Sequence, residues 1–98
     1  MARVIFSISY TIIPEKRDDY LVVIKELKNI VKAEGLESYS VFESKKKNTF
    51  SEVYMFESAQ AYEDFDDNQD ERVDILMTKL SDMIQQQSTT YSTLFEVE

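Results

Sequence analysis

Residues 4–12, with the sequence Val-Ile-Phe-Ser-Ile-Ser-Tyr-Thr-Ile, show the pattern that decides the fold. Apolar side chains recur at every second position, and hydroxyl side chains occupy most of the positions between them. A period of two predicts a β-strand that is buried on one face and semi-polar on the other. The buried face would consist of Val4, Phe6, Ile8, Tyr10 and Ile12.

A helix is predicted directly after this strand. Pro14 suits the first turn of a helix, and the acidic residues at positions 15, 18 and 19 suit the positive end of its dipole. Apolar residues then recur at spacings of three and four as far as Val31. Gly35 follows the last periodic residue, where we expect the left-handed conformation that ends many helices. The outer face would carry Lys16, Lys25, Lys28 and Lys32.

The remainder of the chain repeats these two patterns. Residues 36–44 and 50–57 alternate as strands do, and the segment 45–48, Lys-Lys-Lys-Asn, predicts a solvated hairpin loop between them. Ser58 suits the N-cap of a short helix over residues 59–65. Asn68 and Glu71 have the spacing of a capping box ahead of a second amphipathic helix, whose apolar positions run from 73 to 84, and a last strand is predicted over residues 89–97.

The predicted order of elements is therefore β-α-β-β-α-β, in one domain over residues 1–98. Right-handed crossovers place the helices on one face of a four-stranded antiparallel sheet, which is the α+β, ferredoxin-like arrangement. The other face stays uncovered. Because so short a chain buries only about 60–70% of its unfolded surface, we expect this open face to form a symmetric homodimer. Its residues are Ile5, Ser7, Ser9, Ser38, Ser40, Phe42, Ser51, Val53, Met55, Ser92 and Leu94.

The composition excludes several classes of chemistry. The 98 residues include no histidine and no cysteine, which removes the usual ligands of zinc, haem and iron–sulfur clusters and the thiol nucleophile. Proton transfer would depend on a carboxylate, a lysine or a tyrosine, and we expect no metal or other cofactor. Eleven basic and 19 acidic residues give a net charge of −8, which disfavours nucleic acid and anionic membranes as partners.

Two further patterns in the sequence concern location and metal binding. No stretch resembles a signal peptide or contains the ~20 apolar residues of a membrane span, so a cytoplasmic location is expected.

The acidic segment has the spacing of half a calcium loop, but Gln69 and Ile75 occupy the positions that need glycine and glutamate. Acidic residues favoured by a helix dipole explain this segment better than a metal site does. The residues concerned are Asp64, Asp66, Asn68 and Asp70.

Three stretches resemble the dimeric α/β-barrel superfamily, and within it the antibiotic-biosynthesis-monooxygenase-like branch. Tyr10–Glu15 is similar to the family's exit from its first strand into a proline-started helix, Phe50–Ser58 to its third strand, and Ala61–Phe65 to the helix that follows. The resemblance covers nearly the whole chain in element order. It implies a cofactor-independent monooxygenase or isomerase that acts on a small hydrophobic or aromatic substrate.

The sequence departs from the family pattern at positions that matter for chemistry. Tyr54 and Phe56 stand where the family usually has a glutamate and, two residues later, a tryptophan, and Phe65 stands where many members have histidine. By analogy, a pocket between helices and sheet would be an aromatic cage with phenol hydroxyls as its polar groups. The cage would consist of Tyr10, Tyr54, Phe56, Tyr62 and Phe65.

The residues leave two functions open. One is the enzyme, with Tyr54 and Tyr10 binding or polarising the substrate. The other is a non-catalytic ligand-binding or assembly domain with a filled core, because aromatic residues on the helix-facing side of a small sheet usually form the core. An open cavity at Tyr54 would favour ligand binding.

Overall fold

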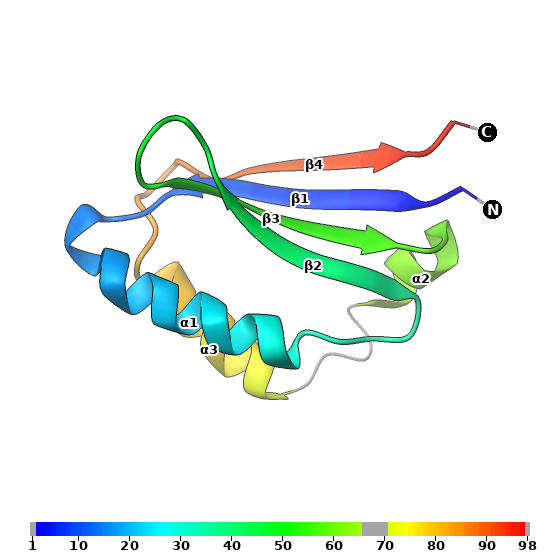
Figure 1. Cartoon of the computed structure of the whole chain (residues 1–98), viewed down its shortest axis with the longest axis horizontal. Helices are drawn as coiled ribbons and strands as arrows, with labels where there is room; N and C mark the ends of the chain where they lie inside the picture. Colours follow the sequence, from blue (N-terminus) through cyan, green and yellow to red (C-terminus); the bar gives the residue numbers. More distant parts are fainter. Residues whose placement is uncertain (1, 66–70, 98) are drawn as a thin grey trace.

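The computed structural model describes residues 2–65 and 71–97 and consists of two layers, a β-sheet and a layer of helices below it (Figure 1). The order of elements confirms the predicted β-α-β-β-α-β arrangement, with the second helical region in two pieces. The strands are β1 (Val4–Thr11), β2 (Leu36–Glu43), β3 (Thr49–Phe56) and β4 (Thr90–Phe95). The helices are α1 (Arg17–Ile30), preceded by a 3₁₀ turn at Pro14–Lys16, α2 (Ala59–Asp64) and α3 (Glu71–Ser81).

The four strands form one antiparallel sheet in the order β2-β3-β1-β4. α1 and α3 lie side by side across one face of the sheet, and α2 lies at the end where β3 finishes (Figure 1). The register places Phe6 beside Tyr54 and Tyr10 beside Phe50, so these side chains share the helix-facing surface. The α+β, ferredoxin-like fold predicted from the alternation is confirmed.

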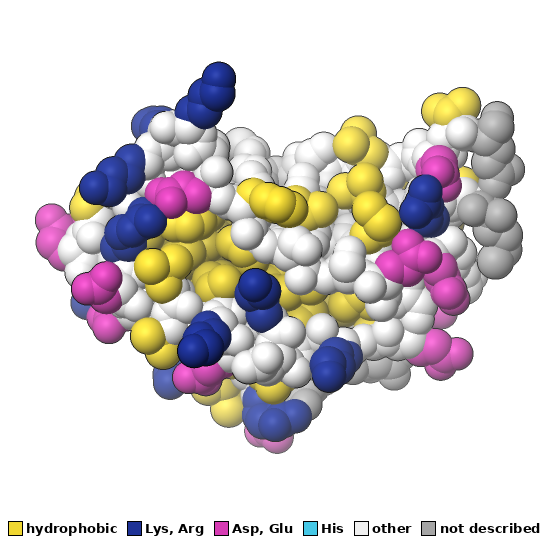
Figure 2. Space-filling view, viewed as in Figure 1, with side chains coloured by type: hydrophobic (Ala, Val, Ile, Leu, Met, Phe, Trp, Pro, Cys, Tyr) yellow, Lys and Arg dark blue, Asp and Glu magenta, His cyan; other side chains and the backbone are white. Residues whose placement is uncertain are grey.

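The core fills the space between the sheet and the two long helices, where Figure 2 shows hydrophobic side chains in the seam. α1 contributes Tyr20, Val23, Ile24 and Leu27, whose spacing of three and four places them on one face. Burying each such side chain contributes roughly 1.5–3 kcal/mol. From α3 come Val73, Leu76 and Leu80, and from the sheet come Val4, Tyr10, Phe50, Tyr54 and Phe56.

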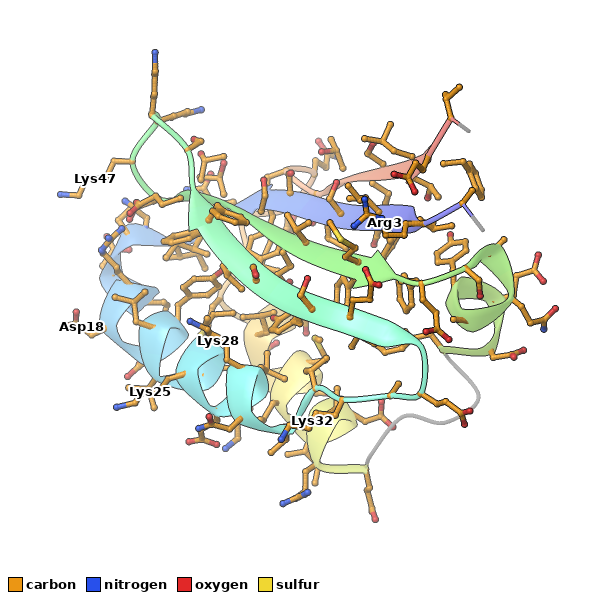
Figure 3. The ribbon with its side chains drawn as sticks, turned by 45° about the vertical axis from the view of Figure 1, so that its right-hand side comes forward. Arg3, Asp18, Lys25, Lys28, Lys32 and Lys47 are labelled. Atoms are coloured by element: carbon orange, nitrogen blue, oxygen red, sulfur yellow. The ribbon has the colours of Figure 1, made fainter. Side chains whose placement is uncertain are left out.

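The lysines of the first long helix and of the hairpin loop are exposed, as the sequence predicted. Lys25, Lys28 and Lys32 project outward from the helix layer, and Lys47 points away from the hairpin loop (Figure 3). That loop is tied to the start of α1, because the Arg17 guanidinium contacts the Glu43 carboxylate at 2.7 Å. This contact lowers the pKa of Glu43 to about 2.

The structure corrects the predicted end of the second long helix and does not describe its predicted start. Residue Ile84 was expected at the end of the second long helix, but α3 ends at Ser81 and Ile84 instead bridges Ile12 as extended backbone. The chain leaves the helix because Ile13 donates its amide to the carbonyl of Met83 at 2.8 Å, which draws this segment onto the end of β1. The cap expected at Asn68 and the acidic residues 66 and 70 lie outside the described residues.

Within the part of the chain that the structure describes, no helix is long and apolar enough to cross a membrane. The two ends of the described chain run along the same end of the sheet, on the neighbouring strands β1 and β4 (Figure 1). Arg3 and Glu96 join these ends through a salt bridge of 3.0 Å.

Gly35 adopts the expected positive φ, 83°, but five residues beyond Ile30, the last residue of α1, in the turn that leads into β2. Its carbonyl accepts the amide of Glu57 at 2.8 Å, and a methyl group at its Cα would collide with Cβ of Ala61. The glycine therefore lets this turn approach both the end of β3 and α2.

We predict that Gly35→Ala lowers the free energy of unfolding by at least about 1–2 kcal/mol, because the left-handed backbone alone is that unfavourable for alanine. Urea unfolding followed by circular dichroism measures the change. Adding Ala61→Gly should recover the part of the loss that comes from the collision. A Gly35→Ala protein as stable as the wild type would show that this turn relaxes freely.

Candidate functional site

A buried carboxylate lies in the middle of the helix-facing surface of the sheet. Residues 50, 52, 54 and 56 of β3 all point toward the helices, and the second of them is Glu52, whose side chain is only 1% exposed. Sequence analysis missed Glu52 because the alternation was judged from the apolar members of the strand. The sequence did contain a signal: position 52 falls on the apolar face of the alternating strand, and a carboxylate is rarely buried there without hydrogen-bonding partners.

Tyrosine hydroxyls surround this carboxylate. Tyr10 of β1 donates to Oε2 at 2.8 Å, and Tyr39 of β2 donates to Oε1 at 2.6 Å. The hydroxyl of Tyr54 lies 3.5 Å from the same Oε1, and the hydroxyl of Tyr20 on α1 lies 2.8 Å from that of Tyr10. We call Glu52 and these four tyrosines the carboxylate cluster. Among the described residues, no buried polar side-chain atom lacks a partner.

The electrostatics of the cluster are set by burial. Burial raises the pKa of Glu52 above its usual value near 4.5, although the hydrogen bonds from the tyrosines act in the opposite direction. Burial and the nearby carboxylate raise the pKa values of Tyr10 and Tyr39, so both stay neutral donors. Within the described residues, 2–65 and 71–97, no ion pair joins Glu52 to a lysine or arginine.

An apolar cavity of about 400 Å³ lies next to the cluster, toward α2. We call it the cage pocket. Its rings approach one another closely, with centroids 5.5 Å apart for Tyr54 and Phe65 and 5.6 Å apart for Phe56 and Tyr62. The volume falls within the roughly 300–1,000 Å³ of small-molecule sites. The lining residues are Phe6, Ile8, Tyr54, Phe56, Tyr62, Glu63, Phe65 and Met77.

Four of the five residues expected in the aromatic cage thus border one cavity, and Tyr10 does not. Tyr10 pairs with Phe50 while Tyr54 pairs with Phe6, which places Tyr10 two pleats farther along the sheet. Its hydroxyl instead donates a hydrogen bond to Glu52. Tyr54 belongs to both groups, since its ring borders the cage pocket and its hydroxyl faces the carboxylate.

Other hollows offer less chemistry. An open groove of about 350 Å³ lies between α1 and α3, lined by Ile30, Ile75 and Leu76 with charged residues at its rim. It contains none of the buried ionisable groups described above. In the described part of the chain, no three His, Cys, Asp or Glu side chains converge as metal ligands do. The arrangement best suited to chemistry is therefore the phenol of Tyr54, with an apolar cavity on one side and a carboxylate on the other.

We predict that Glu52→Ala destabilises the protein by about 2–4 kcal/mol, because it leaves a cavity and removes the acceptor of several buried hydroxyls. Glu52→Gln keeps the volume and an acceptor oxygen and should be much milder. Denaturant unfolding of both variants at one pH measures the difference. Equal losses would show that the hydrogen bonds to the carboxylate contribute little.

A second prediction concerns pH. Since the pKa of Glu52 is raised in the folded state, the folded protein binds more protons than the unfolded chain between pH 4.5 and the folded pKa. The contribution of Glu52 to stability is thus greatest below pH 4.5 and declines as pH rises through this window. Subtracting the Glu52→Gln stability profile from that of the wild type should isolate this decline. A difference that increases with pH would mean that the carboxylate is stabilised in its charged form.

Comparison with known proteins adds to this geometry. No protein-family model matches the sequence, and no curated protein matches it. Solved structures do match. An antibiotic biosynthesis monooxygenase shares 21% identity with a TM-score of 0.77, and the match covers 100% of both chains. A proposed antibiotic biosynthesis monooxygenase from Caulobacter crescentus has a TM-score of 0.81 at 16% identity, over 99% of this chain and 92% of that one.

SnoaB, a cofactor-independent oxygenase from Streptomyces nogalater, has a TM-score of 0.72 at 11% identity, over 94% of this chain and 90% of that one. At these identities the likeness establishes the fold and leaves the chemistry to be argued from this chain's own residues. The chain therefore shares the ferredoxin-like β-α-β-β-α-β fold of these antibiotic biosynthesis monooxygenase structures.

Proposed function

We propose that this chain binds a small aromatic or otherwise hydrophobic molecule in the cage pocket and removes a proton from it, as a cofactor-independent oxygenase or isomerase must. The observation that carries the proposal is the cavity of about 400 Å³ at Tyr54. A filled core at this place would have excluded a ligand.

The walls of the pocket determine the kind of ligand. They are mainly aromatic and aliphatic, with the phenol groups of Tyr54 and Tyr62 as hydrogen-bonding groups and Glu63 at an exposed position. Such walls suit flat rings with one or two oxygen substituents. The similarity to SnoaB supports the same class of reaction, since that protein is a cofactor-independent oxygenase with this fold.

The second candidate is non-catalytic ligand binding, and one observation favours it. Glu52 does not border the cavity, and its two oxygens already accept hydroxyls from Tyr39 and Tyr10. In that case the cluster would only stabilise the fold, and the pocket would hold its ligand unchanged.

We predict that bicyclic and tricyclic ketones and phenols raise the melting temperature of the wild-type protein. A ligand at 100 times its Kd adds about 2.7 kcal/mol, which corresponds to roughly 10 °C or more for a domain of this size. Phe65→Trp should fill part of the cavity and weaken binding at least tenfold, and differential scanning fluorimetry checks both effects.

Val22→Trp is the matched control, because this residue is 58% exposed on α1, away from the pocket, and gains the same side chain. Its ligand response should equal that of the wild type. If no compound in the panel shifts the melting temperature, or if both tryptophan variants respond equally, ligand binding in the cage pocket is wrong.

We further propose that the open face of the sheet covers a second copy of the chain. Phe42 and Leu94 are each 59% exposed on this face, near the half-buried Ile5, Val53 and Met55. Hydroxyls on the same face bond to each other across strands, with Ser9 and Ser51 2.7 Å apart and Thr11 and Thr49 3.0 Å apart. Because these polar groups already have partners, the face is suited to burial.

Light scattering at micromolar concentration should give the mass of a dimer, and Met55→Lys should give a monomer because it places a charge on the open face. Ile75→Lys is the control, since that residue is 54% exposed on the helix side. A monomeric wild-type protein would contradict this assembly and leave the proposal for the pocket standing.

A further inference from the structure

Tyr54 connects the cage pocket to the carboxylate cluster. Among the described residues that line the cavity, it is the one with a hydroxyl near the carboxylate of Glu52, 3.5 Å from Oε1. The side chain is 2% exposed, and its ring packs against Phe65 on the pocket side and Tyr39 on the cluster side, with centroids 5.5 and 4.8 Å away. The Tyr54 side chain therefore lies between the cavity and the carboxylate.

The two oxygens of Glu52 have different surroundings. Oε2 accepts the hydroxyl of Tyr10, which is itself 2.8 Å from the hydroxyl of Tyr20. Oε1 faces Tyr39 and Tyr54. A neutral carboxyl keeps one oxygen as a pure acceptor, so Oε1 can take a proton while Oε2 continues to accept from Tyr10.

We infer that Glu52 is the proton acceptor of this site and acts through Tyr54, an inference that rests on the proposed function. The acidic C–H bond of the bound ligand breaks and its proton joins the oxygen of Tyr54, while the hydroxyl proton of Tyr54 passes to Oε1 of Glu52. The electron pair of the C–H bond stays on the ligand as an enolate. Tyr54 and Glu52 both end neutral, so one negative charge moves from the carboxylate to the ligand and no further reactant is consumed.

The surroundings of Glu52 favour this role. A carboxylate that is 1% exposed and has no ion pair to Lys or Arg in the described chain gains more from accepting a proton than a hydrated one does. Tyr39 is half-buried on the edge strand β2 and donates to Oε1 at 2.6 Å. In this mechanism, Tyr39 would return the proton on Glu52 to solvent.

The mechanism places one demand on the geometry. Hydrogen bonds between oxygens that transfer protons are about 2.5–3.0 Å long. The Tyr54 hydroxyl is 3.5 Å from Oε1, so ligand binding must bring it closer to Glu52. Closing of catalytic hydrogen bonds in the ligand complex is common behaviour in enzymes.

The test measures proton removal directly with 2-tetralone, a bicyclic ketone with acidic hydrogens between its ring and its carbonyl. Proton NMR in D₂O follows the exchange of these hydrogens for deuterium, and a titration of the same probe gives its Kd. Wild-type protein should accelerate exchange. Tyr54→Phe and Glu52→Gln should each slow the catalysed exchange at least 100-fold, the lower end of general acid–base effects, while the Kd changes less than about threefold.

Tyr91→Phe is the matched control, because it also removes one phenol hydroxyl but lies 70% exposed on β4, outside the cavity lining. It should exchange at the wild-type rate. Glu52→Asp should recover part of the activity lost in Glu52→Gln if the carboxylate itself accepts the proton.

The outcomes separate the two proposals. If the wild type binds 2-tetralone but does not accelerate exchange, or if Glu52→Gln exchanges as fast as the wild type, the inference about Glu52 is wrong and the pocket remains. Should the variants lose affinity and exchange together, Glu52 has only a structural role. If neither 2-tetralone nor the wider panel binds, the proposed function fails and this inference falls with it.

Discussion

The interior of this protein depends on the hydrogen bonds that tyrosine hydroxyls donate to the buried carboxylate of Glu52. Taking a carboxylate out of water is strongly unfavourable unless it is paired and hydrogen-bonded. Here the partners are neutral hydroxyls, from Tyr10 on β1 and Tyr39 on β2, with Tyr20 on α1 behind the first. Because each partner comes from a different element, correct register of the sheet and correct docking of α1 are needed to satisfy one charged group.

The space between the sheet and the helices has two parts, one closely packed and one hollow. Toward the β2–β3 hairpin, the tyrosines and Phe50 pack closely, with the rings of Tyr20 and Phe50 4.5 Å apart. Toward α2, the rings of Phe56, Tyr62 and Phe65 surround the cage pocket. The closely packed half contains the hydrogen-bonded polar groups, and the other half contains the cavity in which we propose that a ligand binds.

The sequence was sufficient for the fold because apolar residues follow periods of two and of three to four with few exceptions. The alternation of β3 and the spacing along α2 and its C-cap also placed Tyr54, Phe56, Tyr62 and Phe65 near one another, but the same reasoning put Tyr10 in the cage, where the structure does not have it. It was insufficient for Glu52. Periodicity identifies the side of a strand, but only the three-dimensional packing of Tyr10 and Tyr39 shows that hydroxyls from other strands reach a carboxylate there.

The position of that carboxylate explains how the chain differs from the family it resembles. The resemblance places a glutamate at position 54, where this chain has tyrosine, and the carboxylate lies one pleat earlier, about 7 Å along the same face of β3. A charge at position 54 would border the cavity and meet the ligand directly. In the observed arrangement the phenol of Tyr54 borders the cavity and the charge lies behind it. In the proposed reaction, a substrate would therefore meet the neutral side chain of Tyr54, and the ability of its hydroxyl to accept a proton would depend on a second, buried group.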